Sequence, residues 1–166
     1  QKNKISFFAT GSILFLIGLL DDKFSLKPSV RLILLFLTIF VFLNFVNEFI
    51  IHIIYFESLG LLLNLNNFSL IFTLVSIILL IQIFNFFDGI DLQLSLYVIF
   101  LTFSLFIFSK SLILLAIILI LVFNLYLNKF QKIFLGDAGA YLITFILSVF
   151  IIINYNQSII NSEQVF

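Results

Sequence analysis

Long apolar segments alternate with short polar breaks along the whole chain. The apolar segments, each about 15 to 20 residues long, cover roughly 5–20, 30–46, 68–87, 92–108, 111–127 and 140–155. At about 1.5 Å per residue, a helix of this length crosses, or nearly crosses, the roughly 30 Å hydrocarbon core of a bilayer. The pattern therefore predicts six transmembrane helices within one transmembrane domain over 1–166.

The backbone inside a membrane has no water to bond with, so only helices and closed β-barrels span it. The apolar segments lack the alternation of apolar and polar residues that a barrel strand requires. We therefore predict an all-α, polytopic helix bundle. The break at 47–67 is longer than the others and contains His52, and for it we expect an interfacial hairpin or a re-entrant element.

Composition makes lipid the natural solvent of this chain. Hydrophobic residues make up 63% and charged residues 10% of it, and its mean hydropathy is +1.32, so its apolar surface cannot be hidden in water. The zero net charge offers no basic face for nucleic acid. The absence of cysteine excludes disulfides and thiolate metal sites. The absence of methionine and the start at Gln1 favour an internal fragment of a longer protein.

Aspartates occur in three of the polar breaks, which we expect as loops at about 21–29, 88–91 and 128–139. If each apolar segment crosses the bilayer once, these three loops lie on the same side. That side has five Lys and Arg residues and the other has three, so the positive-inside rule predicts that it is cytoplasmic. All five aspartates of the chain then face the cytoplasm: Asp21, Asp22, Asp88, Asp91 and Asp137.

Each acidic break also has a purely structural interpretation. Asp21 and Asp22 could end a helix ahead of Pro28, and Asp137 could be the N-cap of the last helix. The spacing of Asn85, Asp88 and Asp91 is harder to explain in this way, because residues three apart line up along one face of a helix.

Several carboxylates and one amide at the same membrane face would form a hard, oxygen-rich site. Such a site suits Mg²⁺, with Mn²⁺ as the alternative, and these ions commonly complete their coordination with phosphate oxygens. Three lysines near the aspartates could neutralise phosphate charge: Lys23, Lys27 and Lys132. His52 is predicted on the opposite side, and we expect no catalytic role for it.

In their order along the chain, the three acidic motifs resemble those of one enzyme family. The motifs are Gly18-Leu19-Leu20-Asp21-Asp22, Asn85-Phe86-Phe87-Asp88-Gly89-Ile90-Asp91 and Phe134-Leu135-Gly136-Asp137-Ala138-Gly139. They are similar to motifs of the polyprenyl-phosphate N-acetylhexosamine-1-phosphate transferases, grouped as glycosyltransferase family 4. That family includes the phospho-MurNAc-pentapeptide translocases and the undecaprenyl-phosphate GlcNAc-1-phosphate transferases. The resemblance covers about 11–150.

The resemblance implies that a polyprenyl (undecaprenyl) phosphate attacks the β-phosphorus of a UDP-amino sugar and that UMP leaves. It implies that Asp137 and Asn85 contact a metal ion. It assigns the orientation or deprotonation of the lipid phosphate to Asp21 or Asp22. Asp88 and Asp91 then help to hold the nucleotide or diphosphate. The expected location is the prokaryotic cytoplasmic (inner) membrane, with the reaction on the cytoplasmic face and the product used to initiate a cell-envelope glycan.

Three departures from the family pattern limit what is carried over. Leu92 and Gln93 follow Asp91, where the family usually continues with glycine. Ser25 stands where the translocases place a lysine, which favours the glycan-initiating branch. The His- and Arg-rich loop with which the family recognises the nucleotide sugar has no counterpart before Phe166.

A cation- or proton-coupled transporter is the main alternative, because aspartates within membrane spans also mark ion pathways. It predicts carboxylates near the middle of the bilayer instead of at one face. A CDP-alcohol phosphotransferase lacks support, since Asp88-Gly89 is not followed by that family's Ala-Arg pair. A homodimer is left open.

Overall fold

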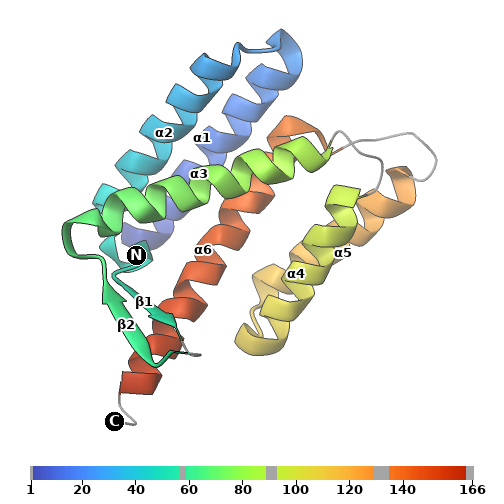
Figure 1. The fold of residues 1–166 in the computed structure, drawn as a ribbon. Helices are drawn as coiled ribbons and strands as arrows, with labels where there is room; N and C mark the ends of the chain where they lie inside the picture. The colour runs from blue at the N-terminus through green and yellow to red at the C-terminus, as the bar shows by residue number, and fades with distance from the viewer. Residues whose placement is uncertain (1, 57–58, 89–92, 129–134, 164–166) are drawn as a thin grey trace.

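The computed structural model describes residues 2–56, 59–88, 93–128 and 135–163, and it is an all-α bundle with one small β-hairpin (Figure 1). Within these residues the α-helices are α1 (Lys2–Phe24), α2 (Pro28–Phe45), α3 (Ser69–Asp88), α4 (Gln93–Ser109), α5 (Leu112–Asn128) and α6 (Gly136–Glu163). The all-α class predicted from the apolar segments is therefore confirmed.

The helices pack as two hairpins around α6. A three-residue linker joins α1 to α2, and a short turn joins α4 to α5. Helix α6 packs against α1, α3 and α4, so it lies between the two hairpins (Figure 1). The central position of α6 places its first residues beside the ends of α1 and α3.

For the break at 47–67 the sequence left open an interfacial hairpin or a re-entrant element, and the structure has a β-hairpin there. Strands β1 (Ile53–Phe56) and β2 (Leu61–Asn64) pair antiparallel, and two 3₁₀ turns, η1 (Asn47–Phe49) and η2 (Asn66–Phe68), flank them. The hydroxyl of Tyr155 in α6 accepts a hydrogen bond of 2.9 Å from the backbone N–H of Tyr55. The hairpin is thus attached near the C-terminal end of α6, at the opposite end of the bundle from Gly136.

Large apolar side chains both fill the core and cover the outside. Tyr141 and Phe145 of α6 are fully buried, and the ring of Phe145 packs edge-on against Phe42 of α2. On the outside, Phe108 and Leu112 are 80% and 82% exposed. A helix that is apolar on all sides is typical of a membrane span, so the outer face is suited to lipid.

Four of the described helices are long and apolar enough to cross a membrane, by length and composition. They are α1 (Lys2–Phe24), α2 (Pro28–Phe45), η2 together with most of α3 (Asn66–Phe86) and most of α6 (Gly136–Ser158). Helices α4 and α5 have 17 residues each, a length of about 26 Å against a hydrocarbon core of about 30 Å. The chain is a multi-pass membrane protein, and spanning by α4 and α5 stays a prediction.

Candidate functional site

The C-terminal end of α1 and the N-terminal end of α6 meet at a very close approach. A Cβ atom added to Gly18 of α1 would lie 2.3 Å from the Cα atom of Ala138. Only glycine allows the two backbones to come this close. The contact brings Asp21 and Asp22, on the last turn of α1, to the first turn of α6.

Asp21 is buried, and three donors hold its carboxylate. Its Oδ2 atom accepts hydrogen bonds from the hydroxyl of Tyr141 at 2.9 Å and from Nη1 of Arg31 at 3.2 Å. Its Oδ1 atom accepts one from the backbone N–H of Leu26 at 3.0 Å. These contacts offset the cost of removing a charged carboxylate from water.

Arg31 connects three helices at this end of the bundle. From the first turn of α2 its guanidinium reaches Asp21 of α1, and its Nη2 donates a 3.4 Å hydrogen bond to the side-chain oxygen of Gln82 in α3. From the sequence, Arg31 was counted only among the five positive charges on the predicted cytoplasmic side, and Tyr141 was not identified. The available signal was the single arginine of the chain and a tyrosine hydroxyl within strongly apolar helices, where polar groups are expected to be paired.

Asp22 is exposed and bonds to the backbone of α6. Its Oδ1 atom accepts a hydrogen bond of 2.9 Å from the N–H of Asp137, and its Oδ2 atom accepts one of 3.3 Å from the N–H of Ala138. The first N–H groups of a helix lack partners within the helix, so Asp22 caps α6. The alternative that Asp137 is the N-cap is wrong, because α6 already begins at Gly136 and Asp137 lies in its first turn.

Asp137 is the third carboxyl group of this cluster. It is partly buried and interacts electrostatically with Asp21, Asp22 and Arg31. Three aspartates and one arginine from α1, α2 and α6 therefore lie together. That all three acidic breaks face one side of the membrane stays a prediction.

Asn85 lies on the last turns of α3, the helix that Arg31 reaches through Gln82. It follows Gln82 by three residues and so lies on the same face of the helix as the side chain that Arg31 contacts. Its Oδ1 atom is buried without a hydrogen-bond partner among the described residues, and the same holds for Nε2 of Gln82 and Nε of Arg31. Buried polar atoms are normally paired, so these atoms are available to a ligand.

The donor atoms fit a hard divalent cation only in part. In the described part of the chain, no group of three or more acidic or histidine side chains converges as a metal site. Two of the aspartates do not converge on a shared metal position because the carboxylates of Asp21 and Asp22 accept hydrogen bonds from protein donors. The carboxyl group of Asp137, which also interacts with Asp21, and the buried Oδ1 atom of Asn85 are the remaining oxygen donors. Mg²⁺ needs few protein ligands when phosphate and water supply the rest.

The other predicted site residues are not brought into this cluster by any described contact. The ammonium of Lys23 lies 5.3 Å from the centre of the neighbouring Phe24 ring, and Lys27 is exposed where α2 begins. The side chain of Asp88, and Asp91 and Lys132 altogether, lie outside the described residues. Their roles stay predictions.

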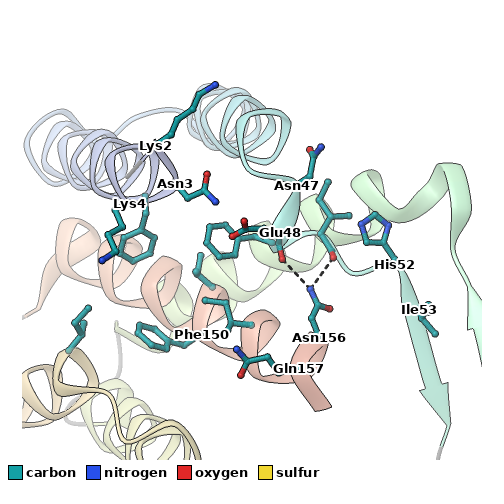
Figure 2. Close-up of a pocket in the computed structure, with 16 residues that line it drawn as sticks. Lys2, Asn3, Lys4, Asn47, Glu48, His52, Ile53, Phe150, Asn156 and Gln157 are labelled. Atoms are coloured by element: carbon teal, nitrogen blue, oxygen red, sulfur yellow. Dashed lines mark hydrogen bonds between the residues drawn. The ribbon is translucent and has the colours of Figure 1, made fainter. Parts of the chain in front are cut away.

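A cavity of about 1060 Å³, drawn in Figure 2, is lined by the first residues of α1, by η1 and the start of the hairpin, and by the C-terminal part of α6, so it lies at the opposite end of the bundle from the aspartates. Among the residues that line it are Lys2, Glu48, His52 and Asn156, and none of the aspartates does. Asn156 donates hydrogen bonds to the backbone oxygens of Glu48 and Ile50 there. His52 is thus remote from the aspartate cluster, and the absence of a catalytic role for it stays a prediction.

Comparison with known proteins identifies one similarity. The family model described as Glycosyl transferase family 4 matches residues 4–155. No curated protein and no solved structure matches the chain. The matched range includes the cluster formed by Asp21, Asp22, Arg31 and Asp137, and it also includes Asn85.

Proposed function

The chain belongs to glycosyl transferase family 4, and from this we propose that it transfers a sugar 1-phosphate from a UDP-sugar to a polyprenyl phosphate. The sugar we propose is an N-acetylhexosamine, and the acceptor is undecaprenyl phosphate. The observation that carries the proposal is the meeting of Asp21, Asp22, Asp137 and Arg31 at one end of a membrane bundle. A lipid phosphate and a water-soluble nucleotide sugar can meet only at such a membrane surface.

In the proposed reaction, an oxygen of the lipid phosphate forms a bond to the β-phosphorus of the UDP-sugar. The bond from that phosphorus to the bridging oxygen breaks, and UMP leaves with the electron pair. Mg²⁺, when bound, offsets the charge of the diphosphate and of the leaving UMP. Asp137 and Asn85 are the residues that would hold it.

The remaining residues position the reactants. The Nε atom of Arg31 and the Nε2 atom of Gln82 are buried donors without partners among the described residues, and they are suited to phosphate oxygens. Exposed Lys23 and Lys27 add positive charge at the same end of the bundle. We further propose that this end faces the cytoplasm of a prokaryotic cell and that the product initiates a cell-envelope glycan.

The transporter alternative is less compatible with the placement of the acids. It predicts carboxylates near the middle of the bilayer. Asp21 and Asp22 instead lie in the last turn of α1, which ends at Phe24, and Asp137 lies in the first turn of α6. A reaction at the membrane surface needs acids at these helix ends.

The direct test uses the complete protein, reconstituted with undecaprenyl phosphate and Mg²⁺, and a panel of UDP-sugars. We expect UMP release with at least one UDP-N-acetylhexosamine and none when the lipid phosphate is omitted. UMP release that does not depend on the lipid, or no release from any UDP-sugar, contradicts the proposal. Proton or cation uptake by the same vesicles would favour the transporter.

A further inference from the structure

We infer that Asp22 is a positioning residue, which holds the first turn of α6 and thereby places the side chain of Asp137. The catalytic importance of placing Asp137 rests on the proposed function. The contact between Asp22 and α6 does not depend on that function. Sequence reasoning could not separate the roles of Asp21 and Asp22. The structure assigns them different partners.

Both carboxylate oxygens of Asp22 bond to the backbone of α6. One accepts the N–H of Asp137 at 2.9 Å and the other the N–H of Ala138 at 3.3 Å. A negative charge at this position also interacts favourably with the positive end of the helix dipole. Leu135 and Gly136 have no side-chain acceptor that could replace it. The cap of α6 therefore comes from α1, across 115 residues of sequence.

Two glycines make room for this cap. Gly18 allows Ala138 to lie against α1, as described above. At Gly136, φ is +69°, and an added Cβ atom would lie 2.9 Å from Oδ2 of Asp22. A side chain at Gly136 would thus be strained and would also push Asp22 away from the helix. The two motifs that contain these glycines form one interlocked unit.

The consequence for the site is that Asp22 acts through Asp137. It bonds to the main chain of Asp137, whose carboxyl group we propose as a metal ligand. Reacting groups must be held to within about half an ångström for efficient catalysis. Without Asp22, the first turn of α6 is free to fray, and Asp137 moves with it.

The decisive measurement is hydrogen–deuterium exchange at the backbone amides of Asp137 and Ala138 in the complete protein. In Asp22→Ala we expect these two amides to exchange roughly tenfold to a hundredfold faster, because a charged acceptor is lost. Asp22→Asn keeps one carbonyl acceptor, so its increase should be smaller. Lys23→Ala, next to Asp22 and exposed, is the control and should leave both amides unchanged. Unchanged exchange in Asp22→Ala overturns the inference.

Kinetics of UMP release then separate a positioning residue from a base. For a positioning residue, kcat should fall in the order wild type, Asn variant, Ala variant, in parallel with the exchange rates. A base at Asp22 would make the Asn and Ala variants equally inactive, which also overturns the inference. If wild-type protein releases no UMP, the proposed function fails, while the exchange data still decide whether Asp22 holds α6.

Discussion

Nη1 of Arg31 lies 3.2 Å from Oδ2 of Asp21, and the aspartate side chain is only 4% exposed. The ion pair joins α1 to α2, and through Gln82 the arginine also reaches α3. A buried carboxylate that loses its partner keeps the cost of desolvation without the compensating attraction. Removing only one member of the pair should therefore destabilise the protein more than removing both.

Arg31→Met is expected to lower the free energy of unfolding by about 3–5 kcal/mol, because it leaves the Asp21 charge buried and unpaired. Adding Asp21→Asn should restore part of the loss. Denaturation of the purified protein in mixed micelles measures both effects. The exposed neighbour Lys27 provides the control, and Lys27→Met should change stability by less than about 0.5 kcal/mol. Fully additive effects of the two substitutions would contradict the coupling.

Gly18→Ala should disrupt the contact between α1 and α6. Its new Cβ atom would lie 2.3 Å from the backbone of Ala138, which cannot move without shifting α6, and such overpacking typically costs about 1–3 kcal/mol or more. Gly11→Ala is the matched control on the same helix. There the nearest atom, at 3.2 Å, is the end of the Leu142 side chain, which can rotate away. Equal melting temperatures for the two variants would show that the close approach is absent.

Asp137→Asn should reduce UMP release by orders of magnitude while leaving the protein folded, because it removes the anionic ligand that we propose for Mg²⁺. The cap of α6 is supplied by Asp22, so loss of a cap cannot explain a defect in this variant. Partial recovery is expected at high Mg²⁺ or Mn²⁺. Near-normal release at ordinary Mg²⁺ would rule out a metal role for Asp137.

Membrane topology can be tested with single cysteines, since the chain has none of its own. We expect Ser25→Cys, Gln93→Cys and Gln131→Cys to be labelled from one side of the membrane and Ser109→Cys from the other. The measurement is reaction with an impermeant maleimide in intact cells and in inverted vesicles. Labelling of positions 25 and 93 from opposite sides would separate the ends of α1 and α3 and refute a shared site.

The sequence predicted the class of the fold better than the ends of its helices. Apolar segments fix where helices lie in lipid, because each unpaired backbone group in hydrocarbon is costly. The break at 21–29 was predicted as a loop, yet α1 continues to Phe24, so Asp21 and Asp22 are helical. Likewise α6 begins at Gly136 instead of near 140. The difference arises because partners on other helices stabilise these polar turns.

What the sequence determined by itself is a membrane helix bundle with aspartates at helix ends, since hydropathy and short motifs are local properties of the chain. Which partners each aspartate binds was decided only by the tertiary structure. Asp21 is bound by Arg31 and Tyr141, and Asp22 by the backbone of α6. Tyr141 and the α6 amides lie more than a hundred residues away in sequence, and a hydrogen bond depends on distance in space. No local pattern could distinguish these two aspartates from Asp137.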